Sequence, residues 1–185
     1  MKITLVRHAE VLESYQGKYN GHIDISLSAN GKLQAKELAN KLQDEDFDRI
    51  YCSDLLRAKE TLDAFEIKIE PIFTSRLREK SWGIHEGKSF DEIQDSGIIY
   101  ENFEQWIKAL DGEDIYEYKD NAKDFLYNTI LSSKSKNILI VTHSGFIKTI
   151  LSIVKKYSLE DAFSINLPYS SFIAISEENL IFNKF

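Results

Sequence analysis

The sequence predicts an α/β protein: a three-layer α/β/α sandwich with a mostly parallel central sheet and an inserted helical cap. Two observations support this prediction. Short apolar runs typical of buried strands alternate with segments in which apolar residues recur at helical spacing, as in βαβ units. A polar, aromatic stretch of helical character, residues 82–131, then interrupts the alternation before a strand and a helix resume. We therefore expect a layered core with a helical insert.

The elements before this insert follow from local patterns. The first four residues after Lys2 form a largely apolar run that stops at Arg7. Leu33, Leu38 and Leu42 recur at helical spacing, and Ser53 and Asp54 offer capping groups for a following helix. The predicted elements are a strand at 3–6, a helix at 29–43, a strand at 47–51, a helix at 55–65 and a strand at 70–74.

The elements after the insert begin with the most apolar run of the chain. Its four residues, Ile138 to Val141, predict a buried strand, and the next segment has the apolar spacing of a helix. The predicted elements are a strand at 137–142, a helix ending near 156, and short strands at 163–166 and 171–175.

The domain organisation is predicted to be simple. The chain has 185 residues and two prolines, and it contains no Ser/Gly-rich linker. We therefore expect one domain over residues 1–185 with a cap insert at about 82–131. A chain of this length buries roughly 70% of its unfolded surface, so it needs no external staple.

Composition limits the partners and the compartment. The formal net charge is −7, which argues against nucleic acid and against an anionic membrane surface as partners. Cys52 is the sole cysteine and excludes an intramolecular disulfide. No secretory signal pattern and no apolar segment of about 18 residues is present. We expect a cytoplasmic protein, and exposed aromatic residues permit a homodimer without indicating one.

Two predicted strands end in histidines. Arg7 and His8 follow the first strand, and His143 and Ser144 follow the strand at 137–142. Ligands bind at the carboxyl ends of parallel strands, so these side chains predict one anion-binding pocket. Ser144 also begins a predicted helix, whose backbone N–H groups favour an anion.

A phosphate site needs cations and an acid as well as a nucleophile. Arg is scarce, with five among 23 basic residues, which favours a geometric role for Arg57 because its planar fork holds two oxygens. The candidate acids are Glu10, Glu79 and Glu86. A metal site of His8, His143, Asp24 and Glu10 lacks a close-spaced ligand motif, so we expect no metal.

Five blocks in order resemble the histidine phosphatase superfamily, the phosphoglycerate mutase-like proteins. Arg7-His8-Ala9-Glu10 resembles its Arg-His-Gly-Glu signature, with alanine in place of glycine. The second block contains two adjacent parts: residues 21–27 look like its Gly-x-x-Asp-x-Pro-Leu turn, with serine in place of proline, and residues 31–35 match its Gly-x-x-Gln-Ala helix. The segments at 50–61, 77–87 and 141–145 are similar to those with its second arginine, its acid and its second histidine.

This resemblance implies roles for the matching residues. His8 would be the nucleophile that becomes phosphohistidine, and Glu79 would be the proton donor and later the base for water. Arg7, Arg57 and His143 would hold the phosphate, with no metal and no other cofactor. Residues expected to line the substrate pocket are Ser14, Gly21, His22 and Ser144.

The expected function is therefore that of a metal-independent phosphomonoester hydrolase. Its partner would be a small phosphorylated metabolite. Within the family the chain most resembles the small bacterial α-ribazole phosphatases, and this resemblance implies α-ribazole phosphate as a candidate substrate. Two alternatives remain open: a phosphoglycerate mutase-type phosphotransferase and a catalytically silent phosphate-binding module. The aromatic residues between Phe90 and Tyr127 fit a cap core better than a base-stacking surface.

Overall fold

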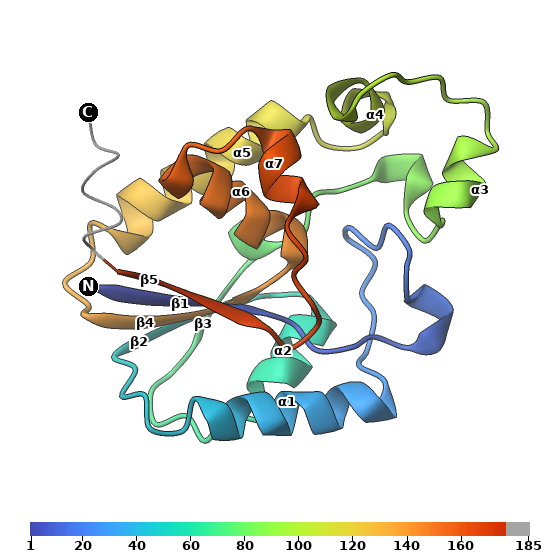
Figure 1. The fold of residues 1–185 in the computed structure, drawn as a ribbon. Helices are drawn as coiled ribbons and strands as arrows, with labels where there is room; N and C mark the ends of the chain where they lie inside the picture. Colours follow the sequence, from blue (N-terminus) through green and yellow to red (C-terminus); the bar gives the residue numbers. More distant parts are fainter. Residues whose placement is uncertain (177–185) are drawn as a thin grey trace.

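The computed structural model describes residues 1–176, so residues 177–185 of the predicted domain lie outside the described part. A five-stranded sheet with the order β3-β2-β4-β1-β5 forms its centre (Figure 1). All neighbouring strands pair in parallel except β1 and β5, which are antiparallel. The strands are β1 (Lys2–Arg7), β2 (Arg49–Ser53), β3 (Ile72–Thr74), β4 (Asn137–Thr142) and β5 (Phe172–Ser176).

Alternate residues of the central strands point to opposite faces of the sheet, as strand geometry requires. On β4, Ile138 and Ile140 belong to one apolar cluster, and Leu139 and Val141 belong to another. All four side chains are at most 2% exposed. Both faces of the sheet are therefore buried, which explains why β4 is apolar without alternation.

Helices cover both faces (Figure 1). One layer consists of α1 (Ala29–Lys41), whose N-cap is Ser28, and α2 (Leu56–Leu62). The opposite layer contains α5 (Ile115–Asp124), which continues into the π-helical segment η4 (Phe125–Ile130), α6 (Ser144–Lys155) and α7 (Leu159–Ser164). The predicted three-layer α/β/α fold with a mostly parallel sheet is confirmed.

The region predicted as a cap divides into two parts. Helices α3 (Phe90–Gln94) and α4 (Phe103–Ala109) lie beyond the carboxyl end of β1 (Figure 1). Helix α5 and η4 instead pack against the central sheet and α6. The Phe125 ring of η4 meets the ring of Tyr51 on β2 and the ring of Phe146 on α6 edge-on. Short 3₁₀ turns complete the connections at Glu13–Tyr15, Ser75–Leu77 and Gly83–His85.

The predicted strand at residues 163–166 is wrong, because this segment ends α7. The Ser158 side chain accepts a hydrogen bond from the Asp161 backbone N–H at 3.0 Å and caps the helix. Phe163 packs its ring on Phe103, with centroids 5.5 Å apart, instead of joining a sheet. The local apolar-polar alternation was therefore outweighed by the helix N-cap at Ser158 and by tertiary packing. Within residues 1–176, no helix has both the length and the apolar character to cross a membrane.

Candidate active site

The ends of β1 and β4 bring the two predicted histidines together. Arg7 pairs with Thr142 in the sheet register, and the His8 backbone N–H donates to the Thr142 carbonyl at 2.9 Å. The His8 and His143 ring centroids are 5.1 Å apart. Residues 135 positions apart in the chain thus meet at the carboxyl edge of the sheet, as the strand-end pattern predicted.

His8 is placed as a neutral imidazole. The side chain is 6% exposed, and its Nδ1 lies 2.8 Å from the Ala9 carbonyl oxygen. A carbonyl only accepts hydrogen bonds, so Nδ1 carries the proton and Nε2 carries the lone pair. Burial lowers the pKa of His8 well below 6.5, and the nearby Arg57 and Arg7 cations lower it further. The ring therefore offers a nucleophilic nitrogen at neutral pH.

Arg57 is almost fully buried at 1% exposure and is oriented by the backbone. Its Nη1 donates to the Ile23 carbonyl at 2.8 Å, and its Nη2 donates to the Gly21 carbonyl at 2.8 Å and to the Asn20 carbonyl at 3.2 Å. Burial lowers its pKa to about 10, so the guanidinium is still charged at pH 7. The loop at residues 20–23 thus fixes the plane of this cation.

Arg7 carries a buried donor with no partner among the described residues, its Nε. Its Nη1 donates to the Leu167 carbonyl, and its guanidinium lies 4.1 Å from the centroid of the Tyr169 ring. Leaving a buried charged donor unpaired costs about 1–3 kcal/mol or more, and a bound oxyanion would remove that cost. This geometry suits an anion site.

His143 differs from the other predicted phosphate ligands. It is fully buried, and both ring nitrogens face protein groups. Its Nδ1 accepts from the Arg57 Nε at 3.2 Å, so the proton is on Nε2, which donates to the Ser53 hydroxyl oxygen at 2.8 Å. Burial, followed by the Arg57 charge, lowers its pKa well below 6.5. In this arrangement His143 holds Arg57 in place.

Glu79 lies against the first turn of α6. Its Oε2 accepts from the Gly145 backbone N–H at 2.9 Å, and its Oε1 accepts from the Lys80 N–H at 3.0 Å. The helix N-terminus, predicted as a site for a bound anion, therefore holds this side chain. A Cβ at Gly145 would come within 2.0 Å of the Glu79 Oε1, so the carboxyl group rests directly on the glycine.

A cavity of about 470 Å³ joins these groups. Arg7, His8, Arg57, Glu79 and Ser144 all contribute to its wall, whereas Ser14, Gly21, His22 and His143 are not among the lining residues. Ser14 is exposed, and His22 instead lines a neighbouring cavity of about 350 Å³ that shares Glu79. Gly21 contributes its carbonyl to Arg57. The remaining lining residues are Val11, Gly17, Lys18, Tyr19, Asn20, Trp82, Phe103, Trp106, Ile107, Gly145, Lys148, Phe163 and Tyr169.

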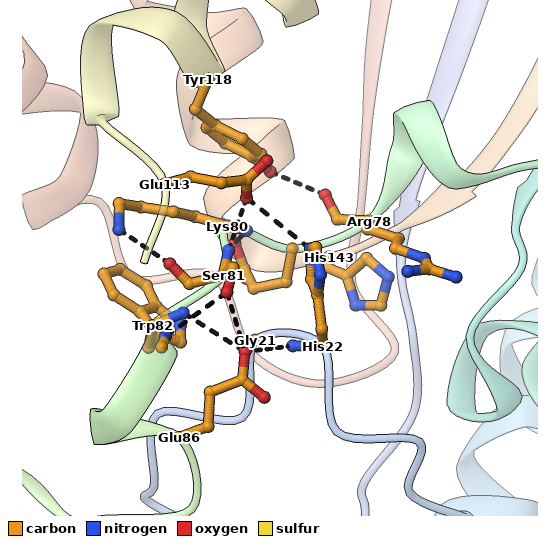
Figure 2. A network of polar contacts seen from close by, with 12 residues as sticks. Gly21, His22, Arg78, Lys80, Ser81, Trp82, Glu86, Glu113, Tyr118 and His143 are labelled. Atoms are coloured by element: carbon orange, nitrogen blue, oxygen red, sulfur yellow. Dashed lines mark hydrogen bonds and ion pairs between the residues drawn. The ribbon is translucent and has the colours of Figure 1, made fainter. Parts of the chain in front are cut away.

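A network around Glu86 supports this cavity from outside (Figure 2). The Glu86 Oε1 accepts from the backbone N–H of His22 at 2.7 Å and of Trp82 at 3.3 Å, and from the Ser81 hydroxyl at 3.3 Å. It thereby ties the loop that orients Arg57 to the segment that carries Glu79. The geometry separates two candidate acids, since Glu79 lines the cavity and Glu86 does not.

The remaining candidate acid and the alternative metal site have other placements. The Glu10 carboxylate accepts from the Ser28 hydroxyl at 2.7 Å and from the Asn30 amide at 3.2 Å. Asp24 accepts from the Leu56 backbone N–H at 2.6 Å at the start of α2. No group of three His, Cys, Asp or Glu side chains within residues 1–176 is arranged to hold a metal ion.

The sequence did not single out several residues of the cavity wall. Lys148 and Tyr169 were not predicted. Trp82 begins the predicted cap insert, and Phe103 and Trp106 are among the aromatic residues expected to form the cap core. Trp106 does both, because it belongs to the main apolar cluster at 6% exposure and also lines the cavity. Lys148 had a usable signal: it lies one helical turn after Ser144, on the same face of α6.

Comparison with known proteins identifies the family. A sequence model of the histidine phosphatase superfamily (branch 1) matches residues 3–179. A probable phosphatase of Schizosaccharomyces pombe is 30% identical over 155 residues, covering 81% of this chain and 71% of that protein. Phosphoserine phosphatase 1 of Hydrogenobacter thermophilus is 32% identical over 152 residues, covering 78% of this chain and 71% of the relative.

Solved structures agree with this result. The α-ribazole phosphatase from Shigella flexneri superimposes with a TM-score of 0.81 at 25% identity, covering 95% of this chain and 90% of that one. The chain therefore belongs to the histidine phosphatase superfamily, and it is a phosphatase. The family resemblance found in the sequence is confirmed.

Replacing Gly145 with alanine is expected to displace the Glu79 carboxyl group while the fold stays intact. The added methyl group would overlap the far end of a flexible side chain, which can move, and not a rigid backbone atom. We expect kcat to fall about 100-fold, the scale for a catalytic group misplaced by about 1 Å. Steady-state kinetics and urea unfolding would check this, and an unchanged kcat would show that the position of Glu79 is unimportant.

Stability is expected to fall when the pH drops below about 6.5. Burial holds the pKa values of His8 and His143 well below 6.5, whereas in the unfolded chain both protonate near that value. The unfolded state then binds more protons, so the free energy of unfolding decreases by up to about 1.4 kcal/mol per pH unit for each histidine. Urea unfolding at about pH 7 and about pH 5.5 tests this, and equal free energies would contradict it.

Proposed function

We propose that this protein hydrolyses a small phosphomonoester through a phosphohistidine on His8, without a metal ion. The observation that carries the proposal is the arrangement in one cavity of a neutral imidazole, the buried guanidinium group of Arg57, the half-buried guanidinium group of Arg7 and the carboxyl group of Glu79. A histidine attacks phosphorus when it is neutral and oriented and when cations offset the charge on the moving phosphoryl group. His8, Arg7 and Arg57 meet these requirements.

In the first step the substrate phosphate would lie between Arg7 and Arg57. The His8 Nε2 lone pair forms the bond to phosphorus while the bond from phosphorus to the ester oxygen breaks. Glu79, in its protonated form, gives its proton to that oxygen, so the alcohol leaves neutral and Glu79 becomes a carboxylate. The hydrogen bond from His8 Nδ1 to the Ala9 carbonyl keeps the ring oriented during attack.

In the second step water would occupy the place of the departed alcohol. The Glu79 carboxylate takes a proton from water, the water oxygen bonds to phosphorus, and the bond from phosphorus to His8 Nε2 breaks. Inorganic phosphate is released, and Glu79 is again protonated. The backbone N–H bonds from Lys80 and Gly145 hold the carboxyl group in one position through both steps.

The substrate would be a small phosphorylated metabolite, as the size of the cavity suggests. α-Ribazole phosphate is one candidate, supported by the similarity to the Shigella flexneri α-ribazole phosphatase. Phosphoserine is another, supported by the similarity to phosphoserine phosphatase 1 of Hydrogenobacter thermophilus.

Trapping the phosphoenzyme tests the mechanism. The protein would be mixed with labelled p-nitrophenyl phosphate in EDTA and quenched in alkali, where phosphohistidine survives and phosphoserine is lost. Label on the peptide that contains His8, together with phosphate release over a panel of phosphomonoesters, is the expected result. Turnover without a labelled histidine would contradict the intermediate, and turnover abolished by EDTA would contradict metal independence. Conversion of 3-phosphoglycerate without phosphate release would favour a mutase.

A further inference from the structure

Lys148 lies in the cavity wall and has no role in the proposed phosphoryl transfer. It is half-buried on α6, and its Nζ donates to the Phe163 carbonyl at the end of α7 at 2.8 Å. An ammonium group has three donors. The bond to Phe163 therefore fixes the direction of the side chain and leaves N–H groups for a ligand.

The positive charge of the residues that line the cavity exceeds the negative charge of one phosphate group. Four cations (Arg7, Lys18, Arg57 and Lys148) face one carboxyl group, that of Glu79. With Glu79 ionised, the wall carries three positive charges, although the whole protein has a net charge of −7. A phosphomonoester dianion offsets two of them. One positive charge remains if Glu79 is ionised, and two remain if Glu79 carries the proton that the proposed first step requires. Either excess favours a second anionic group on the substrate.

The surroundings of Lys148 make its charge costly when the cavity is empty. Burial lowers its pKa, the Glu79 charge opposes this effect, and the Arg7 charge adds to it. The Phe163 ring beside it packs on Phe103, so one side of the ammonium group is apolar. An anion that pairs with a partly desolvated ammonium group gains more than it would in water.

Lys148 lies one helical turn beyond another residue of the cavity wall. Lys148 is four residues beyond Ser144, which lines the cavity at the start of α6. At 1.5 Å per residue the separation along the helix axis is about 6 Å. The ammonium group therefore belongs to the same wall of the cavity as the Gly145 N–H that holds Glu79, one turn further along the helix.

We propose that Lys148 is a specificity-determining residue that binds a carboxylate, and that the substrate is a small phosphorylated hydroxy acid. The inference rests on the proposed function, because it assumes that the phosphate occupies the Arg7 and Arg57 end of the cavity. Carboxylate recognition would then be separable from catalysis. Removing the ammonium group should weaken binding of one class of substrate and leave the chemistry intact.

A matched substrate pair tests the proposal. 3-Phosphoglycerate and glycerol 3-phosphate differ in one group, a carboxylate in the first and a hydroxymethyl group in the second. For Lys148→Met we expect kcat/KM for 3-phosphoglycerate to fall about 10- to 100-fold, mainly through KM, the scale for one charge-assisted hydrogen bond. For glycerol 3-phosphate we expect a change of less than about two-fold.

Two controls make the outcome decisive. Lys36→Met removes an exposed lysine of α1 and should change neither substrate. Titration calorimetry of the His8→Ala variant, with and without Lys148→Met, measures the affinity for both compounds in the absence of turnover. Equal losses for both compounds, or no preference of the unsubstituted site for the carboxylate, would overturn the inference. Failure of the proposed function is distinguishable, because p-nitrophenyl phosphate would then give no labelled His8.

Discussion

Replacing His8 with alanine is expected to reduce phosphate release at least about 10³-fold, because the nucleophile is lost. The two guanidinium groups proposed to bind phosphate, those of Arg7 and Arg57, remain, so the variant should still bind inorganic phosphate. It should also remain folded, since within residues 1–176 the His8 side chain makes one hydrogen bond, to the adjacent Ala9 carbonyl. Phosphate release, phosphate titration and urea unfolding together check these expectations.

His8→Asn is the matched conservative variant. It keeps a polar side chain at the end of β1 and lacks the imidazole, so it should be as inactive as His8→Ala. Turnover close to that of the unsubstituted protein in either variant would reject the phosphohistidine route. Loss of both turnover and phosphate binding would instead indicate that His8 shapes the anion site.

Replacing Arg57 with alanine is expected to have the second-largest effect. We expect kcat/KM to fall at least about 10³-fold, because a charge that stabilises the transferring phosphoryl group is lost. The free energy of unfolding should also decrease by about 2–4 kcal/mol, since the carbonyls of Asn20, Gly21 and Ile23 lose their buried donor. Kinetics and urea unfolding of the same variant measure the two effects.

Arg57→Lys separates charge from geometry. Lysine keeps the positive charge but cannot donate to the loop carbonyls, to His143 and to a phosphate at once, so kcat/KM should recover only partly. Arg49→Ala is the control, because Arg49 is exposed at the start of β2, away from the cavity. Full activity in Arg57→Lys would mean that the fixed plane of the guanidinium group is not needed.

Much of the fold could be predicted because the signals are local. The apolar runs that became β1 and β4 end at Arg7 and Thr142, and this placement brought His8 and His143 together. The predicted strand at residues 163–166 failed because a short alternating segment cannot be told from the end of a helix without its tertiary contacts. Here the deciding contact was the packing of Phe163 on Phe103.

The site was predicted less completely, because side-chain direction depends on distant partners. The sequence predicted His143 as a phosphate ligand. It could not show that both ring nitrogens of His143 are hydrogen-bonded within the protein, to Arg57 and to Ser53. The residues alone left Glu10, Glu79 and Glu86 as candidate acids, and the family resemblance selected Glu79. In the structure the backbone N–H groups of His22 and Trp82, at different places in the chain, donate to the Glu86 carboxylate, which does not line the cavity. The Glu79 carboxyl group does line it.

The contact of Arg7 with Leu167 and Tyr169 has a consequence for the synthesis of the protein. Strand β1 is translated before both of its sheet neighbours, β4 and β5, and two strands and five α-helices of the described structure lie between β1 and β4 in the chain. During synthesis β1 therefore has no neighbouring strand until β4 has been translated. Phosphate-binding capacity should then arise in one step, once Leu167 and Tyr169 have been translated and can contact Arg7. A nascent chain that lacks these residues would neither sequester nor hydrolyse phosphorylated metabolites.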